Sequence, residues 1–560
     1  MTIFLIVLFG FLLLSVPLFV LMGGLTALGY VLFGDAKSLL DFGLAENIRE
    51  LTDKAPLLAI PFFVLSGAIM SNGAIAGRLV AVARAFFAFM PGGLAVAAVA
   101  ACTFFAAISG SSPVTVITIG GIMYPAMIKA GYPKRFATGL VTSAGTLGII
   151  IPPSIPMIVY AIFASGTQVI QVEELFLAGI GPGLLIASLL SLYCVFTGWR
   201  MGERFRKPDL GALKTAISEG FWSLMLPVII LGGIYTGLFT ATEAAAVSVI
   251  YALIVELFIH RELGVKEIPK VFGEATVLMG SLLVIFAVAV SLNGLLSDLE
   301  IPDRAAAWIT SLDLTPVTFL LVLNGFLLIV GCLMDIMSAI MILVPLLVPM
   351  GALCGVDPIH LGLIFIVNLE IGYLTPPMGL NLFVSSSLFK QSLGSVIRSV
   401  VPFTGILVVA LLIVTYVPSV SLGPVNWLKD RPFHVPFPEN PVCRHAEDEA
   451  GGGLFGAPVS AAPTTTGGQK SLDQLMKEAN YDDAFGDDEA PESAAPASGP
   501  KSLQDLMKEA DYDSAFDDDE APASAEAPAS AEAPASAAPA SAEAPASAAP
   551  ASAEAPASQP

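Results

Sequence analysis

The chain has 560 residues, of which 55 % are hydrophobic and only 13 % are charged. Mean hydropathy is +0.79 and long apolar runs recur, which excludes an ordinary soluble domain and indicates membrane spans. The net charge of −21 is concentrated near the end, because residues 432–560 hold 24 acidic and 5 basic residues. The rest of the chain is nearly neutral, so its charge does not indicate a nucleic-acid partner.

Apolar runs predict membrane spans along the first 428 residues. They cover residues 3–33, 55–71, 134–164, 172–198, 222–238, 241–259, 271–294, 358–388 and 401–420. The first run is too long for a signal peptide and is interpreted as a retained span. Polar tips split segments 92–128 and 316–352, which predicts two re-entrant hairpins. Segments 35–53, 74–90 and 303–312 mix charged and apolar residues, as interfacial arm helices do.

Lys and Arg gather in alternate connections between the spans. They are Arg78, Arg84, Lys129, Lys134, Arg135, Arg200, Arg204, Arg206, Lys207, Arg261, Lys266, Lys270, Lys390 and Arg398. The opposite connections, such as 165–171 and 353–357, are poor in basic residues. The positive-inside rule then predicts a cytoplasmic N-terminus, a periplasmic C-terminal tail, and hairpins that open on opposite faces.

Two stretches of the chain match each other without a gap at a constant offset of 224 residues. The aligned pairs are Pro125 with Pro349, Gly131 with Gly355, Gly148 with Gly372, and Pro152–Pro153 with Pro376–Pro377. Duplicated broken helices indicate the central binding site of a secondary transporter. We therefore predict an all-α polytopic membrane protein with inverted repeats at about 55–198 and 271–420. The alternative, two Pro-kinked helices in a large helical protein, leaves the shared register unexplained.

The hairpin tips and helix breaks offer hydroxyls and free backbone carbonyls, which can replace the hydration shell of a cation. We predict two Na⁺ sites, each between one tip and one break. The first comprises Ser109, Gly110, Ser111, Ser112, Gly145, Thr146 and Gly148. The second comprises Gly331, Met334, Asp335, Ser338, Glu370, Gly372 and Thr375.

Helices that begin at the tips and after the Pro-Pro pairs can bind an anion at their N-termini. The predicted substrate residues are Ser112, Pro153, Ser154, Thr375, Pro377 and Asn381. No Lys or Arg lies inside a central span, so dipoles, hydroxyls and bound cations would hold an anionic substrate. Glu243 fits a capping box with Thr240. Glu256 and Glu274 are expected at the membrane interface.

The remaining motifs give no sign of an enzyme. HExxH, GxSxG and P-loop patterns are absent from the sequence, so we expect ion gradients to drive transport, without an organic cofactor. Cys102, Cys194, Cys332, Cys354 and Cys443 show no ligand spacing. We therefore expect neither a metal centre of the Cys/His type nor a disulfide framework.

The composition changes after residue 428. Residues 429–468 resemble a linker, and residues 469–522 contain an acidic amphipathic motif twice, because Lys470–Ala479 recurs as Lys501–Ala510. The motif could be a docking helix or part of a solvated tail. Residues 523–560 are a low-complexity Ala/Pro/Ser/Glu tail, disordered by composition.

Several motifs in order resemble the large membrane (M) subunit of tripartite ATP-independent periplasmic (TRAP) transporters. They are LAIPFF at 58–63, AISGSSP at 107–113, AGTLG at 144–148, PPS at 152–154, TATEAA at 240–245, DPIHLG at 357–362 and TPPMGLNLFV at 375–384. The resemblance covers residues 1–428 and implies an elevator-type, Na⁺-driven symporter of the bacterial inner membrane. It also implies a small membrane subunit (Q), a periplasmic binding protein (P) and an organic acid substrate. The pattern is most similar to the C4-dicarboxylate branch, which takes up succinate, malate and fumarate.

Three alternatives remain open at this point. One is a stand-alone Na⁺–anion symporter that needs no binding protein, and a second is a TRAP permease for another organic acid. The third is a non-transporting receptor or scaffold whose acidic tail is the functional part. Uptake by the chain alone would support the first, and uptake that survives deletion of residues 430–560 would exclude the third.

Overall fold

The computed structural model describes residues 18–33, 54–165, 170–377, 379–438 and 443. All of them belong to one compact unit, residues 1–456. The predicted acidic motif and low-complexity tail lie outside the described residues. The described part is helical and contains no strand. It has 8 helices that are long and apolar enough to cross a membrane, or up to 9 if one bent pair is a single span.

The first half of the unit runs from an N-terminal helix to a hairpin and a broken helix. Its helices are α2 (Leu18–Phe33), η2 (Ala55–Leu58), α5 (Ala59–Asn72), α6 (Ile75–Phe87), α7 (Gly93–Ser109), α8 (Ser112–Lys129), α9 (Lys134–Ala144), α10 (Leu147–Ile150), α11 (Ile155–Ala164) and α12 (Val172–Arg200). The predicted span at 134–164 is bent by 42° where the Pro-Pro pair interrupts it. The broken helix is therefore present where the sequence placed it.

Three helices and an arm connect the two halves. They are α13 (Leu210–Tyr235), α14 (Ala241–Ile254), which continues as the π-helix η3 (Val255–His260), α15 (Ile268–Asp298) and α16 (Ile301–Ser311). Helix α13 begins earlier than the predicted span at 222, because Asp209 caps it by accepting a hydrogen bond from the Ala212 N–H. The capping box of Thr240 and Glu243 is confirmed at the start of α14.

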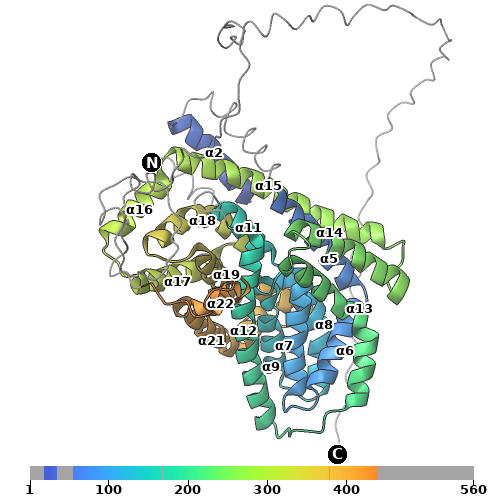
Figure 1. The fold of residues 1–560 in the computed structure, drawn as a ribbon. Helices are drawn as coiled ribbons and strands as arrows, with labels where there is room; N and C mark the ends of the chain where they lie inside the picture. Colours follow the sequence, from blue (N-terminus) through green and yellow to red (C-terminus); the bar gives the residue numbers. More distant parts are fainter. Residues whose placement is uncertain (1–17, 34–53, 166–169, 378, 439–442, 444–560) are drawn as a thin grey trace, which may run out of the picture. The chain divides into compact units, whose positions relative to one another are not determined.

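The second half repeats the order of the first. Its helices are α17 (Pro316–Leu333), α18 (Ile336–Leu353), α19 (Pro358–Gly372), α20 (Leu380–Phe389), α21 (Leu393–Tyr416) and α22 (Ser419–Leu428). A hairpin, a helix broken at a Pro-Pro pair and a long helix follow one another in both halves. Figure 1 shows the labels of α6–α9 toward the right and those of α16–α19, α21 and α22 toward the left, with α15 running above both groups.

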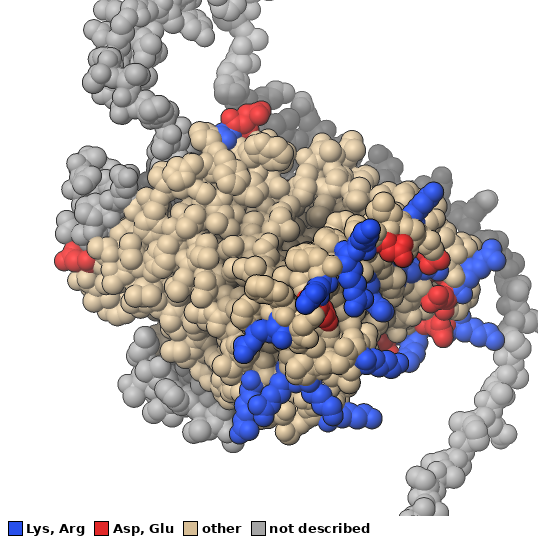
Figure 2. Space-filling model, turned by 90° about the horizontal axis from the view of Figure 1, so that it is seen from below, with Lys and Arg blue, Asp and Glu red and all other residues tan. Residues whose placement is uncertain are grey.

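Both hairpins have the expected helix–turn–helix form. Helices α17 and α18 have 18 residues each and are apolar, so their length also fits a crossing. Re-entrance and inverted topology therefore stay predictions. Figure 2 shows Lys and Arg side chains gathered over one part of the face seen from below, while much of the rest is uncharged. This clustering is the asymmetry that the positive-inside argument uses.

Glu256 lies near the end of the candidate span Ala241–His260, which agrees with its predicted place near a span end. Its side chain is fully buried and accepts hydrogen bonds from the N–H groups of Ala74 at 3.0 Å and Ile75 at 2.9 Å. These groups open α6, so the carboxylate of η3 caps a helix that is distant in sequence. The sequence analysis did not predict this contact, because nothing in the sequence indicates that these two segments meet.

The sequence predicted no disulfide framework, and the described residues contain one disulfide. Cys354, which ends α18, is bonded to Cys443. The two residues are 89 positions apart, and no spacing rule connects them. Cys102 and Cys194 are free and buried, and Cys332 is free and partly exposed.

Candidate substrate and cation site

A cavity of about 340 Å³ lies where the two hairpin tips meet; we call it the central cavity. The two tips contribute Ser109–Ser112 and Asp335 to its wall, and α5 and α15 add the polar residues Ser71, Asn72 and Glu274. Much of its apolar wall comes from α5 and α15, through residues such as Val64 and Leu278. The hairpins and broken helices therefore form one part of the wall, and α5 and α15 form the other.

The first tip is a turn rich in hydroxyl groups. Helix α7 ends at Ser109, and Gly110 follows with φ of +58°, a left-handed conformation that favours glycine. The Ser109 hydroxyl lies 3.0 Å from the Thr115 hydroxyl, which donates to the Ser111 carbonyl at 2.8 Å. Thr115 is a polar residue of this site that the sequence analysis missed, although its spacing from Ser111 is that of a helical turn.

The first tip packs directly against the first helix break. A Cβ atom at Gly148 would lie 2.6 Å from both the Ser111 carbonyl oxygen and the Thr115 hydroxyl. The Gly145 backbone packs on Val116. The Thr146 hydroxyl is buried and donates to the Ser143 carbonyl. The structure thus brings the predicted residues of the first Na⁺ site together, and glycine makes the close backbone approach possible.

The second tip and second break have the same arrangement with fewer hydroxyls. A Cβ atom at Gly372 would lie 2.4 Å from the Gly331 carbonyl carbon, so the two backbones touch. Asp335 caps α18 by accepting from the Met337 N–H at 3.0 Å. Its other carboxylate oxygen accepts from the Tyr373 hydroxyl. Tyr373 also lines the central cavity, and the sequence analysis missed it.

The other predicted residues of the second site differ in how far their side chains are buried and in what they contact. Ser338 is buried, Met334 is half-buried, and the Thr375 hydroxyl donates to the Ile371 carbonyl at 2.8 Å. Glu370 was grouped with this tip, but it does not line the central cavity. Its carboxylate is 1 % exposed and lies beside the hydroxyl of Thr146, at the first break. Among the described residues, neither Glu370 oxygen has a hydrogen bond of normal geometry.

Two of the predicted substrate residues contact each other across the repeats. The Asn381 side-chain N–H₂ donates to the Ser112 hydroxyl at 2.6 Å, and both side chains are buried. The Asn381 amide oxygen and the buried Ser154 hydroxyl have no hydrogen-bond partner within the described part of the chain. The Pro153 carbonyl lies against Gly110, and Pro377 is exposed. Of the predicted substrate residues, Ser112 lines the central cavity, and the other five do not.

Four helices begin at the central cavity. The first residues of α8, α11, α18 and α20 all line it: Ser112, Ile155, Ile336 and Leu380. The unpaired N–H groups at a helix N-terminus carry partial positive charge and favour an anion. Within the described residues no Lys or Arg lines the cavity, whereas Asp335 and Glu274 do.

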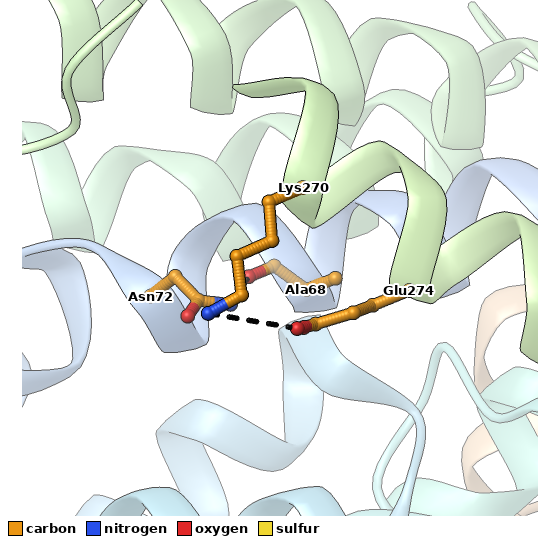
Figure 3. A network of polar contacts seen from close by, with 4 residues as sticks. All are labelled: Ala68, Asn72, Lys270 and Glu274. Atoms are coloured by element: carbon orange, nitrogen blue, oxygen red, sulfur yellow. Dashed lines mark hydrogen bonds and ion pairs between the residues drawn. The ribbon is translucent and has the colours of Figure 1, made fainter. Parts of the chain in front are cut away.

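A second cavity, of about 640 Å³, adjoins the central one, and the two share Ser71, Asn72 and Val114 in their walls. Figure 3 shows Asn72, whose side chain donates to the Ala68 carbonyl at 2.9 Å. Lys270 and Glu274 of α15 form an ion pair of 3.9 Å beside it. Both side chains are mostly exposed, so this pair contributes little to stability.

The family match and the most similar relatives agree on the family of this chain. Residues 5–420 match the family described as "Tripartite ATP-independent periplasmic transporter, DctM component". The chain is 46 % identical over 387 residues to the C4-dicarboxylate TRAP transporter large permease protein of Pseudomonas aeruginosa, covering 69 % of this chain and 90 % of that protein. It is 40 % identical over 447 residues to the protein of the same name from Vibrio cholerae, covering 76 % and 96 %.

The chain is also similar to a permease with a different substrate and to a solved transporter structure of low sequence identity. The chain is 40 % identical over 374 residues to an isethionate TRAP transporter permease of Oleidesulfovibrio alaskensis, covering 66 % of this chain and 58 % of that one. Among solved structures it resembles the YdaH transporter of Alcanivorax borkumensis with a TM-score of 0.55 and 15 % identity. That match covers 75 % of this chain and 99 % of the other, and it supports the fold alone.

Proposed function

The chain belongs to the DctM family of large TRAP transporter permeases, and on this premise we propose that it couples Na⁺ entry to the uptake of a C4-dicarboxylate. Large permeases of this family work with a small membrane subunit and a periplasmic binding protein and transport an organic acid. The chain is a multi-pass protein of the inner membrane, and it is a transporter rather than an enzyme.

The convergence of four helix N-termini on the central cavity is the observation that carries the proposal. Two of these helices follow a hairpin tip and two follow a Pro-Pro break. A dicarboxylate has two anionic ends, and N-termini contributed by both halves offer each end its own donors. In this arrangement Ser112, Ser154 and Asn381 supply polar contacts to the substrate.

The charge of the site supports the proposal of sodium coupling. Asp335 and Glu274 are acidic, and the described lining residues include no Lys or Arg to offset a dianion. Bringing a dianion next to carboxylates in a low-dielectric cavity is costly unless cations enter with it. The tip carbonyls, the hydroxyls of Ser109 and Thr115, and the Asp335 carboxylate are suitable oxygen ligands for Na⁺. We assign one ion to each tip–break pair.

The construction of the cavity also fits an elevator mechanism. Part of its wall belongs to the hairpins and broken helices, and the remainder belongs to α5 and α15. If the first group moves as a body past the second, the bound ions and substrate travel together while the apolar helices stay. The substrate-bearing side would then face the two compartments in turn.

Uptake of radiolabelled succinate into proteoliposomes tests this proposal, with both membrane subunits reconstituted and the binding protein supplied outside. Accumulation is expected with an inward Na⁺ gradient and is lost when choline replaces Na⁺. Uptake that is unchanged in choline would contradict the coupling. Uptake by the large subunit without either partner would favour a stand-alone symporter.

The isethionate permease of Oleidesulfovibrio alaskensis supports a second candidate substrate class. Isethionate is a sulfonate with a single negative charge, so the two classes differ in charge and in length. Competition decides between them: excess unlabelled succinate or malate should abolish succinate uptake, and isethionate should leave it unchanged. The reverse pattern would assign this chain to the sulfonate.

A further inference from the structure

The chain does not leave the helical unit after α22. Residues 429–438 and Cys443 pack against the ends of other helices, and we call these residues the strap. Lys429 forms an ion pair with Glu174 in the first turn of α12. The Val435 N–H donates to the Ser419 hydroxyl at 2.9 Å. The predicted linker therefore begins with a packed segment.

Cys443 holds both ends of the second hairpin. Its N–H donates to the Leu314 carbonyl at 2.8 Å, just before α17 begins at Pro316. Its sulfur is bonded to Cys354, which ends α18. Both cysteines are fully buried. A single residue thus joins the two chain segments through which the hairpin enters and leaves.

The strap contacts residues in or beside two connections between helices that contain no basic residue. Glu174 follows the connection at 165–171, and Cys354 lies in the connection at 353–357. Both connections lack Lys and Arg, whereas the opposite ones, such as 200–207, are rich in them. By the positive-inside rule the strap lies on the periplasmic side. A disulfide persists in the periplasm and is rare in the cytosol, so the covalent bond supports the same side by an independent argument.

We infer that Cys354 and Cys443 form a structural disulfide in the periplasm, which closes the open end of the second hairpin and anchors the strap. Residues 444–560 then begin on the periplasmic side, next to that hairpin. The acidic tail is consequently tethered at the face where substrate arrives. This inference does not depend on the identity of the substrate or of the coupling ion.

Formation of the bond needs an electron acceptor. Two thiols lose two protons and two electrons as the sulfur–sulfur bond forms. A periplasmic dithiol oxidase in its disulfide form accepts them through a mixed disulfide and leaves as two thiols. The inference therefore predicts that the bond depends on such an oxidase in the cell.

Counting thiols in the full-length protein tests the bond. Cells are quenched in acid, and the denatured protein is treated with a maleimide that adds a fixed mass to each thiol. We expect three tags without reduction, on Cys102, Cys194 and Cys332, and five after reduction. The Cys354→Ser/Cys443→Ser variant should take three tags in both cases, and the control Cys332→Ser should take two and four.

Two outcomes would overturn the inference. The first is five tags on the unreduced wild-type protein in cells that have the oxidase, because both thiols would then be free. The second concerns the side of the membrane. Alkaline phosphatase fused after Pro560 should be active and green fluorescent protein at the same place should be dark; the opposite pattern would place the tail in the cytoplasm.

Discussion

The hydrogen bond from Asn381 to Ser112 joins the second broken helix to the first hairpin tip. Replacing Asn381 by alanine removes the donor and leaves the buried Ser112 hydroxyl without this partner. Losing a partner in a buried hydrogen bond costs about 1–3 kcal/mol, so we expect succinate uptake at low concentration to fall about tenfold. Initial uptake rates at several succinate concentrations measure the effect.

Ser385→Ala is the matched control for this substitution. Ser385 lies on the same helix, is buried, and accepts a hydrogen bond of 2.7 Å from Thr142. Neither Asn381 nor Ser385 is part of the cavity wall, but Ser385 bonds to α9, whereas Asn381 bonds to Ser112 at the tip, which does line it. The two variants should lose similar stability, but only Asn381→Ala should raise the succinate concentration needed for half-maximal uptake. Equal uptake kinetics in the two variants would remove Asn381 from the substrate site.

Asp335 combines a structural and a proposed ionic role. Its carboxylate caps α18 and accepts from Tyr373. Asparagine keeps the capping oxygen but removes the charge, so Asp335→Asn should fold normally. If Asp335 holds Na⁺, the Na⁺ concentration for half-maximal uptake should rise several-fold. A titration of uptake against Na⁺ measures this change.

Asp357→Asn provides the comparison for Asp335→Asn. Asp357 caps α19 in the same way, accepting from the Ile359 N–H at 2.8 Å, and lies outside the central cavity. The Asp357→Asn substitution removes the same negative charge as Asp335→Asn, also from a residue that caps a helix. Its Na⁺ dependence should match that of the wild type. A parallel change in both variants would indicate a general effect of net charge instead of a Na⁺ ligand.

At the scale of the elements, the contact between α17 and α19 depends on two glycines. A Cβ atom at Gly372 would meet the Gly331 backbone at 2.4–2.5 Å, and neither backbone can move aside without shifting a helix. Gly372→Ala should therefore destabilise the protein by about 1–3 kcal/mol and reduce uptake strongly. Thermal unfolding in detergent and transport assays check the two effects.

Gly325→Ala is the control for this contact. Gly325 lies within α17, and a Cβ atom there meets nothing within 4 Å. Alanine is favoured over glycine in a helix interior by about 0.5–1 kcal/mol, so this variant should be as stable as the wild type or more so. If Gly372→Ala behaved like Gly325→Ala, the tip and the break would not be in contact.

The hairpins and the broken helices could be predicted because their signals are local. Proline removes an N–H from the helix, and the Ser-Gly-Ser-Ser turn cannot continue one, so the breaks appear in the sequence itself. Because the two repeats align with each other, each hairpin tip could be paired with the helix break of its own repeat. The contacts of Gly148 with Ser111 and of Gly372 with Gly331 agree with that pairing.

The contacts that could not be predicted join segments without a shared local pattern. Glu256 caps α6 from 182 residues away, and Cys443 reaches Cys354 from beyond the last long helix. Tyr373 looks like any aromatic residue of an apolar helix until its hydroxyl meets Asp335. The position of Glu370 beside Thr146 likewise depends on how the two breaks pack together.

For the whole molecule, two truncations separate the strap from the tail. Deleting residues 444–560 keeps the strap and its disulfide, so uptake and thermal stability should match those of the wild type. Deleting residues 429–560 removes both, and losing a disulfide that closes a long loop costs about 2–4 kcal/mol. The midpoint of thermal unfolding should fall in the second truncation alone.

These truncations also test the role of the tail. Loss of uptake on deleting residues 444–560 would support a receptor or scaffold whose tail is the functional part. Equal stability of the two truncations would show that the strap does not support the second hairpin. Purified protein in one detergent, measured beside the full chain, gives both comparisons.

The order in which the ribosome makes the two cysteines has a consequence for biogenesis. Cys443 follows Cys354 by 89 residues, with α19 to α22 between them. The crosslink can close only after those helices have been synthesised and inserted. In a pulse-chase experiment, the oxidised fraction would therefore report the age of each permease and distinguish finished molecules from those still being assembled.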